Sequence, residues 1–225
     1  MDLARRGDLP WRARLFAALG VEPGRVRCVR QVHSCTVVRI DGSESPDGPF
    51  VEADGMATDR PDLLLTVTVA DCLPVFLADR RTGAFALVHS GWRGTGIAAE
   101  AVRLMAAAYG ARAADLAATI GPGIGPCCYA VPAERYDRFR ALYGPRAVQR
   151  GLDGSFRLDL RAANAILLER EGVGDVATIS DCTSCNPLLG SFRREGAVFT
   201  RMLAFIGAWG AVGSAAAGGS GAAER

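Results

Sequence analysis

The pattern of apolar and polar positions divides the chain into short strands and amphipathic helices. Runs rich in β-branched residues predict the strands, and apolar positions at helical spacing predict the helices. The predicted strands are residues 25–32, 35–40, 63–70, 74–78, 84–89, 117–120, 177–180 and 202–206. The predicted helices are 9–20, a segment with apolar positions from Ile97 to Ala108, 132–142 and 159–171, the last with Asp159 as its N-cap.

The order of these elements predicts an α/β fold with a mixed sheet flanked by helices. The strands between residues 70 and 90 are separated by junctions that suit hairpins, whereas parallel neighbours need a long crossover. A chain of 225 residues, 49% of them hydrophobic, is long enough for one core. We therefore expect a single catalytic domain over residues 1–210. Residues 211–225 are rich in Ala, Gly and Ser and predict a disordered tail.

Charge and hydropathy narrow the classes of function. The net charge is +2 and no basic run stands out, so charge does not indicate nucleic-acid binding. No apolar run reaches the roughly 18 residues that a membrane helix needs, and residues 1–10 lack the apolar stretch of a signal peptide. We expect a cytoplasmic protein that acts on a small molecule, as a monomer or weak homo-oligomer, without a nucleic-acid or membrane partner.

All 26 basic residues are arginine, because the sequence contains no lysine. This excludes a Schiff-base lysine and a P-loop lysine. Any anion that the protein binds must be held by guanidinium groups, backbone amides or a metal.

Three side chains with metal-binding chemistry follow predicted strands. His33 lies at a bend between strands, Cys72 follows a β-rich run, and His89 lies where a strand stops before a helix. Imidazole nitrogen and thiolate sulfur are preferred zinc donors, and three protein ligands leave the open fourth position of a catalytic site. The spacing fits no zinc-finger template, so the residues alone leave two other interpretations: ordinary buried side chains, or a metal-free nucleophile and base formed by Cys72 and His89.

The candidates for binding an anion are Arg93, Ser191 and Arg193. Arg93 lies in SGWRG at the start of a predicted helix, where a guanidinium and backbone amides favour phosphate or carboxylate. Ser191 and Arg193 lie in a second arginine-rich turn. Asp71 is expected to be structural.

The remaining cysteines are interpreted as structural. The chain has seven cysteines, an odd number that argues against a disulfide framework. Cys127 and Cys128 are adjacent in a proline-rich turn, and Cys182 and Cys185 form a single CxxC. One CxxC without a second pair or a histidine does not complete a zinc site.

Seven motifs appear in an order that resembles a known family. They are RQVHS, ADGMATD, TVADCLPVFLAD, VHSGWRG, IGPGIGPCCY, CTSC and SFRREG, between residues 30 and 196. Together they resemble the YfiH-type laccase-domain family, whose members have been called multicopper polyphenol oxidases, peptidoglycan-editing factors and purine nucleoside phosphorylases. The resemblance runs from about residue 10 to residue 207.

The resemblance implies a fold related to toxin deamidase domains and a metal, usually zinc, on His33, Cys72 and His89. It implies a zinc-dependent purine nucleoside phosphorylase with adenosine deaminase activity, in which Cys72, His89 and Arg93 are catalytic and nucleoside and phosphate are the substrates. On this basis we expect about one zinc ion per chain. Relatives usually begin with an additional strand-bearing segment, and if the protein lacks it, one wall of the pocket would be missing. Phe192 also replaces the usual tyrosine of the SYRR motif.

The family resemblance also implies two alternative functions, a Cu²⁺-dependent polyphenol oxidase and a peptidoglycan-editing role. A blue-copper centre takes two histidines and a cysteine. The sequence has only two histidines, so none would remain for a separate copper cluster. A true multicopper oxidase is thereby excluded, which leaves weak phenol oxidation by adventitious copper as the copper-dependent alternative.

Overall fold

The structure is a computed structural model that describes residues 9–45 and 50–208. The tail predicted at 211–225 lies outside the described residues. The helices are α1 (Leu9–Ala18), α2 (Ile97–Tyr109), α3 (Ala133–Tyr143), α4 (Leu160–Arg170) and α5 (Phe192–Glu195). The strands are β1 (Val26–Cys28), β2 (Val37–Arg39), β3 (Gly55–Thr58), β4 (Leu64–Val69), β5 (Leu73–Asp79), β6 (Phe85–Ser90), β7 (Leu116–Ile120), β8 (Ala130–Val131), β9 (Val148–Arg150), β10 (Phe156–Leu158), β11 (Asp175–Thr178) and β12 (Met202–Gly207).

The fold is α/β with mixed strand directions, as predicted, but its strands form three sheets instead of one. The largest sheet has the order β11-β7-β5-β6-β3-β2, and its central strand pairs are antiparallel while both outer pairs are parallel. A second sheet has the order β1-β4-β12, and a small antiparallel sheet has the order β8-β10-β9. The prediction of a single sheet was wrong because hydrophobic periodicity identifies strands but not their partners.

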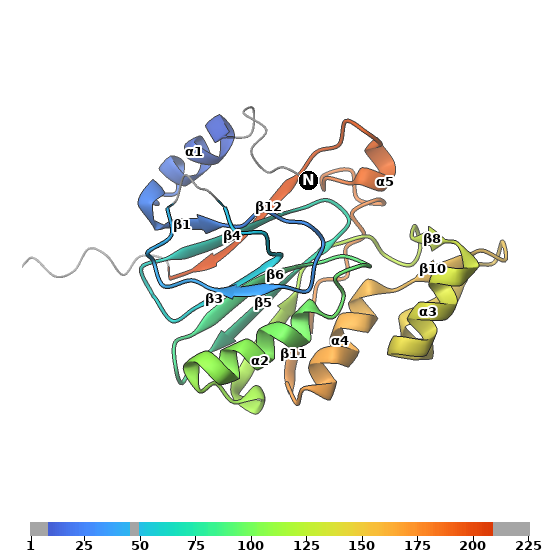
Figure 1. Cartoon of the computed structure of the whole chain (residues 1–225). Helices are drawn as coiled ribbons and strands as arrows, with labels where there is room; N and C mark the ends of the chain where they lie inside the picture. Colours follow the sequence, from blue (N-terminus) through green and yellow to red (C-terminus); the bar gives the residue numbers. More distant parts are fainter. Residues whose placement is uncertain (1–8, 46–49, 209–225) are drawn as a thin grey trace, which may run out of the picture.

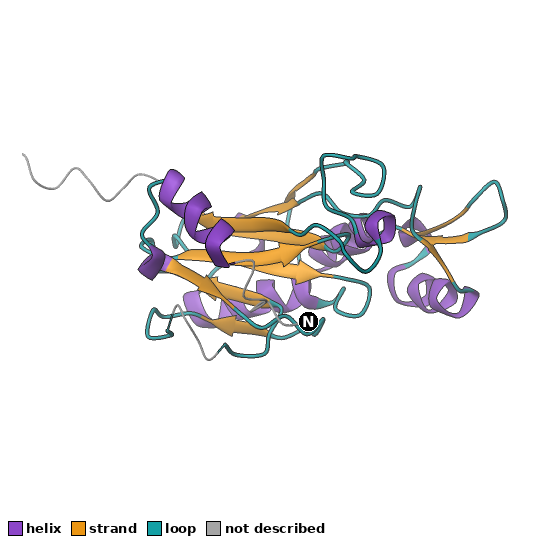
Figure 2. Ribbon diagram, turned by 90° about the horizontal axis from the view of Figure 1, so that it is seen from above, coloured by secondary structure: helices purple, strands orange, loops and turns teal. Residues whose placement is uncertain are grey.

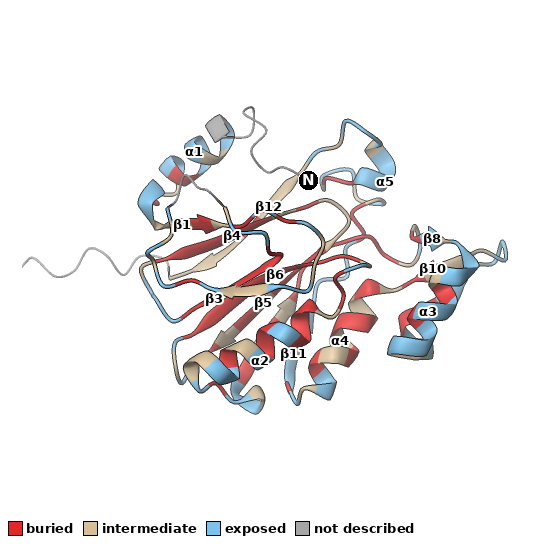
Figure 3. Cartoon of the chain, viewed as in Figure 1, coloured by how far each residue is buried: buried red, intermediate tan, exposed pale blue. Residues whose placement is uncertain are grey.

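The two larger sheets pack face to face, and helices cover the outer faces (Figure 1). One core lies between the six-stranded sheet and helices α2 and α4, and a second lies between the two sheets. A small third cluster packs Phe16 and Val21 against Leu64 of β4. Figure 3 shows the buried residues concentrated on the strands and on the inward sides of α2 and α4. The small antiparallel sheet and α3 project at one end of the molecule (Figures 1 and 2).

The central hairpin fixes two of the three predicted metal ligands. β5 and β6 are antiparallel neighbours in which Pro74 pairs with His89. Alternation along β6 points Ala86 and Val88 to the helix side and Phe85 and Leu87 to the space between the sheets. His89 lies two residues after Leu87, so its side chain is on the same face of the sheet. It therefore points to the end of the space between the two larger sheets.

Most predicted elements are present, with limited differences. The strand predicted at 25–32 ends at Cys28, because only an isolated bridge from Arg30 to Glu52 continues the pairing. The strand predicted at 177–180 is β11, shifted to Asp175–Thr178. Asp159 caps α4 as predicted, since its carboxylate accepts a hydrogen bond from the backbone N–H of Ala162 at 3.0 Å. In the described part of the chain, none of the helices combines the length and the apolar character that crossing a membrane requires.

Candidate active site

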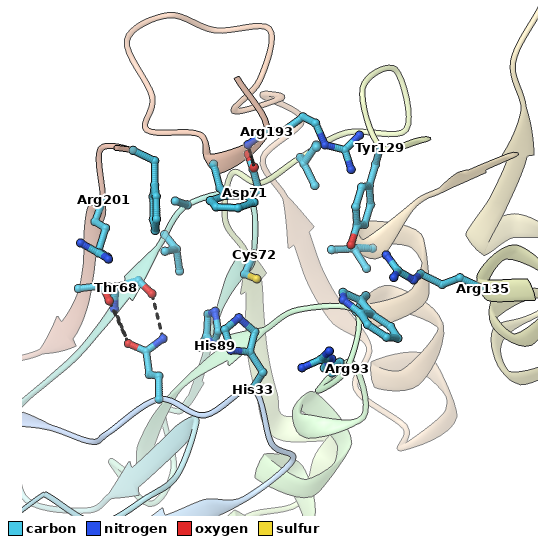
Figure 4. A pocket seen from close by; sticks show the side chains of 18 residues that line it. His33, Thr68, Asp71, Cys72, His89, Arg93, Tyr129, Arg135, Arg193 and Arg201 are labelled. Atoms are coloured by element: carbon cyan, nitrogen blue, oxygen red, sulfur yellow. Dashed lines mark hydrogen bonds between the residues drawn. The ribbon is translucent and has the colours of Figure 1, made fainter. Parts of the chain in front are cut away.

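The three predicted metal ligands come together at one end of the two larger sheets. His33, Cys72 and His89 place their ligand atoms within 4.8 Å of one another. The two imidazole rings meet edge to face, with 4.9 Å between their centroids. Figure 4 shows the sulfur of Cys72 directed toward both rings. The sequence separates these residues by up to 56 positions, and the fold brings them together.

Two of the turns that carry this site have left-handed backbone conformations. His33 has φ 61° and Asp71, which precedes Cys72, has φ 78°. Such conformations cost roughly 1–3 kcal/mol for residues other than glycine, and they persist only where the surroundings hold them. The carboxylate of Asp71 accepts hydrogen bonds from the Thr183 hydroxyl and from the Arg193 backbone N–H, both at 2.6 Å. The expectation that Asp71 is structural agrees with these contacts.

The turn at His33 is organised by Asp54, which is fully buried. Its carboxylate accepts hydrogen bonds from the backbone N–H groups of Val32, His33 and Ser34, at 3.1, 2.9 and 2.6 Å. The same carboxylate lies 2.8 Å from Nδ1 of His89. One side chain therefore positions both histidines and leaves Nε2 of His89 for a ligand in the cavity.

Hydrogen bonds among Asp54, Cys72 and His89 favour the charged form of each of these side chains. Burial opposes ionisation of Cys72, but hydrogen bonds from His33 and His89 outweigh it and lower the pKa of the thiol to about 7. Burial would also lower the pKa of His89, yet hydrogen bonds with Asp54 and Cys72 raise that pKa to about 9. Burial raises the pKa of Asp54, but hydrogen bonds from His89 and Ser34 dominate and hold it at about 2.

The donor set and its surroundings fit a divalent metal such as zinc. Two imidazoles and a thiolate match zinc's preferred donors, and the carboxylate on the far nitrogen of His89 is the usual support for a zinc-binding histidine. The backbone also makes room for the sulfur. A Cβ at Gly91 would lie 2.7 Å from Sγ of Cys72 and 3.4 Å from the ring of His33, so only glycine leaves the space between these donors open.

A cavity of about 520 Å³ opens above the three side chains. Its walls combine aromatic and cationic side chains, and Figure 4 shows Arg93, Arg135, Arg193 and Arg201 around it. The lining residues are Gln31, His33, Thr68, Val69, Ala70, Asp71, Cys72, His89, Trp92, Arg93, Ile124, Tyr129, Arg135, Leu160, Phe192, Arg193, Phe199 and Arg201. Ser191 is not among them.

The three predicted anion-binding residues occupy different positions. Arg93 lines the cavity over the Trp92 ring, at 5.2 Å from its centroid, and has no hydrogen bond or ion pair with other described residues. Arg193 lines the cavity too, but its guanidinium donates to the carbonyl oxygens of Cys128 and Ala130, at 2.9 and 3.3 Å. Ser191 is fully buried and caps α5, where its hydroxyl accepts from Arg194 N–H at 3.2 Å. Ser191 therefore caps α5 and does not line the cavity.

The four cysteines that were interpreted as structural form a second group. Cys127, Cys128, Cys182 and Cys185 place their sulfur atoms within 4.8 Å of one another. The interpretation that the CxxC lacks a second pair was wrong, because the fold brings Cys127 and Cys128 beside it. Gly123 and Cys182 form a backbone bridge that brings the two loops together, and sequence separation hides this contact.

Several site residues were not predicted from the sequence. Asp54 lies in the ADGMATD motif, but an aspartate after a small residue gives no local signal of burial against a histidine. Arg135 lies on α3 and reaches the cavity across the Trp92 ring, 3.9 Å from its centroid. Trp92 could have been found from its place in SGWRG, beside Arg93. The positions of Arg135 and Arg201 depend on tertiary packing alone.

Comparison with known proteins places this chain in a family. Residues 10–209 match the family described as multi-copper polyphenol oxidoreductase laccase. The chain belongs to this family. It is 35% identical to the purine nucleoside phosphorylase YlmD of Geobacillus stearothermophilus over 210 residues, which cover 87% of this chain and 77% of YlmD. It is 32% identical to the human purine nucleoside phosphorylase LACC1 over 185 residues, which cover 78% of this chain and 42% of LACC1.

Solved structures of family members have the same fold. The crystal structure of YlmD from Geobacillus stearothermophilus superposes with a TM-score of 0.81 at 33% identity, and covers 87% of this chain and 78% of that one. The structure of YfiH from Bacillus licheniformis gives a TM-score of 0.80 at 34% identity, and covers 87% and 79%. The resemblance inferred from the seven motifs is confirmed, and the protein is an enzyme.

Proposed function

We propose that the protein is a zinc-dependent purine nucleoside phosphorylase that also deaminates adenosine. The observation that supports this most directly is the His33–Cys72–His89 donor group at the base of a cavity with several guanidinium groups. The relatives named above are purine nucleoside phosphorylases. The cavity volume of about 520 Å³ falls within the range typical of small-molecule sites.

Zinc would be held by one nitrogen of each histidine and by the thiolate of Cys72. It would supply Lewis acidity and lower the pKa of a water molecule, chemistry suited to hydrolytic deamination at C6 of adenine near neutral pH. The protein contributes the geometry: Asp54 orients His89 through Nδ1 and holds the backbone of His33. This arrangement fixes two donors before any metal binds.

Phosphorolysis requires a phosphate near the ribose carbon that carries the base. A phosphate oxygen forms a bond to C1′ while the bond from C1′ to N9 breaks, and the departing base takes the bonding electrons and a proton. We assign Arg93 to holding the phosphate, because its guanidinium has no competing hydrogen bond or ion pair among the described residues and faces the cavity. Arg193 is less available, since backbone carbonyls already accept from it.

The apolar part of the cavity suits a purine ring. Trp92, Tyr129, Phe192 and Phe199 supply aromatic surface, and aromatic stacking is tolerant of the base's substituents. Gln31 exchanges hydrogen bonds with Thr68: its amide nitrogen donates to the carbonyl oxygen at 2.9 Å, and its oxygen accepts from the backbone N–H at 2.9 Å. These bonds link the segment before His33 to β4 and keep that wall of the cavity in place.

A second candidate function is a metal-free cysteine hydrolase. The specific observation in its favour is the hydrogen-bonded series Cys72, His89 and Asp54, in which a thiol, an imidazole and a carboxylate lie in the order of a nucleophile, a base and its orienting group. Such an enzyme would keep its activity after chelation, whereas the zinc-dependent one would lose it.

The test is incubation of purified protein with adenosine, inosine and a diphenol, each with and without phosphate. The proposal expects phosphate-dependent release of free base from inosine, conversion of adenosine to inosine or hypoxanthine, and loss of both activities on chelation with recovery on adding zinc. No base release by folded, zinc-loaded protein would refute the phosphorylase assignment. Oxidation of the diphenol alone, in the presence of copper, would favour the oxidase.

Replacing Arg93 with alanine is expected to raise the KM for phosphate by about 10- to 100-fold, because hydrogen bonds to charged groups contribute roughly 1.5–3 kcal/mol. Zinc content should stay the same, since Arg93 is not a donor. The matched control is Arg80→Ala, which removes an exposed arginine from the turn at the far end of the β5–β6 hairpin. Steady-state kinetics with varied phosphate concentration measure this effect. An unchanged KM for phosphate would contradict the assignment of Arg93 to phosphate binding.

A further inference from the structure

The four-cysteine group joins two loops that are far apart in the sequence. Cys127 and Cys128 follow the turn after β7, and Cys182 and Cys185 follow β11. Sγ of Cys185 lies 3.6 Å from Sγ of Cys127 and 3.3 Å from Sγ of Cys128, and all four sulfur atoms lie within 4.8 Å of one another. No other described residue of a metal-binding type belongs to this group.

We propose that these four cysteines bind a single structural zinc ion, separate from the His33–Cys72–His89 site. Zinc binds four thiolates tetrahedrally at about 2.3 Å, which places the sulfur atoms about 3.8 Å apart. The distances of 3.3 and 3.6 Å and the upper limit of 4.8 Å bracket this value. Four protein ligands leave no open position, so this site is structural where the other is catalytic.

The surroundings of Cys182 favour a thiolate at that sulfur. The backbone N–H of Gly125 donates to Sγ of Cys182 at 3.2 Å, a contact that stabilises a negatively charged sulfur. A Cβ at Gly125 would lie 3.2 Å from Sγ of Cys127 and 3.2 Å from Cβ of Cys182. Glycine at this position therefore lets the loop approach the cysteines closely.

Arginines around the group offset the charge that such a site carries. Four thiolates and one zinc ion have a net charge of −2, which is costly without nearby cations. Arg157 donates to the carbonyl oxygen of Cys127 at 2.7 Å, and Arg193 donates to that of Cys128 at 2.9 Å. Arg161 donates to the carbonyl oxygen of Ser180 at 2.7 Å, just before the CxxC. These guanidinium groups hold both loops and place positive charge beside them.

The proposed ion would stabilise one wall of the active-site cavity. Tyr129, which follows the Cys127–Cys128 pair directly, lines the cavity, and so does Arg193, which stacks over the Tyr129 ring at 5.3 Å from its centroid. Asp71 beside the catalytic group accepts a hydrogen bond from Thr183, which lies inside the CxxC. A zinc ion that joins the two loops would therefore hold the wall opposite β4 without contacting the substrate.

The first test counts metal in variants purified from cells supplied with zinc. The wild-type protein should contain about two zinc ions per chain, and Cys185→Ser and Cys72→Ala should each contain about one. The double variant should contain none. Cys35→Ser is the matched control, because Cys35 is exposed and belongs to neither metal-binding group, and it should keep both ions. Equal zinc in wild type and Cys185→Ser would overturn the proposal.

The second test reads the ligands directly and does not depend on whether Cys185→Ser folds. X-ray absorption at the zinc edge of the Cys72→Ala protein should show one zinc ion surrounded by sulfur alone, at about 2.3 Å. Nitrogen or oxygen neighbours, iron in place of zinc, or a disulfide found by counting thiols in the denatured, metal-free protein would each refute the four-thiolate zinc site. The measurement is independent of the phosphorylase proposal, since neither metal count nor absorption spectrum requires activity.

Discussion

Cys72→Ala is expected to lose one zinc ion per chain and to lose nucleoside phosphorolysis and deamination by on the order of 1000-fold or more. Removing Cys72 reduces three ligands to two, and a metal that contributes several kcal/mol of transition-state stabilisation corresponds to this factor. Elemental analysis gives the metal content, and initial rates with adenosine and inosine give the activity. Circular dichroism and thermal melting establish that the variant is folded.

Cys72→Ser separates the loss of the zinc ligand from the loss of packing. Its hydroxyl has nearly the same size as the thiol but is a weak zinc donor, so it should behave like the alanine variant while preserving the packing against Gly91. Cys35→Ser should retain full zinc and activity. If Cys72→Ala kept as much zinc as the wild type, the assignment of the catalytic metal to His33, Cys72 and His89 would be wrong. If activity survived metal loss, the cysteine-hydrolase alternative would be excluded as well, because that mechanism also needs the thiol.

The second large effect is expected at Asp54. Asp54→Ala removes the acceptor of three backbone N–H groups and the partner of His89, and we expect it to destabilise the fold by about 3–5 kcal/mol. Asp54→Asn keeps the shape and one acceptor oxygen but not the charge. This variant should stay folded and bind zinc at the catalytic site about 10- to 100-fold more weakly, the usual effect of losing a group that supports a metal-binding histidine.

The measurements for Asp54 are denaturant unfolding and competition with a zinc chelator. The chelator titration is best done in a Cys185→Ser background, so that only the catalytic site contributes. Asp79→Asn is the control, because Asp79 is also buried and accepts hydrogen bonds from Arg81 N–H and the Thr82 hydroxyl, but far from the metal ligands. It should alter stability and leave zinc affinity unchanged. Equal zinc affinity in Asp54→Asn and wild type would contradict a positioning role for Asp54.

The sequence predicted most elements because their signals are local. The apolar spacing of α2, the cap at Asp159 and the β-rich runs of β4 and β6 each lie within a dozen residues. The strands β3, β8, β9 and β10 were missed because each has four residues or fewer, which is too short to show a period. The pairing of strands into separate sheets was missed for another reason, since partners such as β4 and β12 are more than 100 residues apart.

The site was predictable to the extent that its chemistry is rare. A chain with two histidines leaves few candidates, so His33 and His89 stood out, and Cys72 followed from its place after a strand. The four-cysteine group was not predicted, because two pairs that are each incomplete become adjacent only through the bridge between Gly123 and Cys182. Ser191 was selected from its motif, yet its hydroxyl is used within its own turn. Sequence motifs identify residue types, while packing decides which side chains reach the cavity.

The β5–β6 hairpin has one end at the catalytic group and the other at an exposed turn. The Arg81 side chain of this turn contacts the carbonyl oxygen of Gly110 and the carboxylate of Asp115. Asp79 accepts from the backbone N–H of Arg81 at 2.8 Å, and its backbone N–H donates to the carbonyl oxygen of Ala84 at 2.8 Å. Seven residues of strand separate this turn from Cys72, or about 20 Å at 3.3 Å per residue. A fluorescent or affinity peptide inserted beside the exposed Arg80 of this turn would therefore report on the enzyme without disturbing its metal. A single deletion within β5 would instead rotate Cys72 to the opposite face of the sheet and separate it from both histidines.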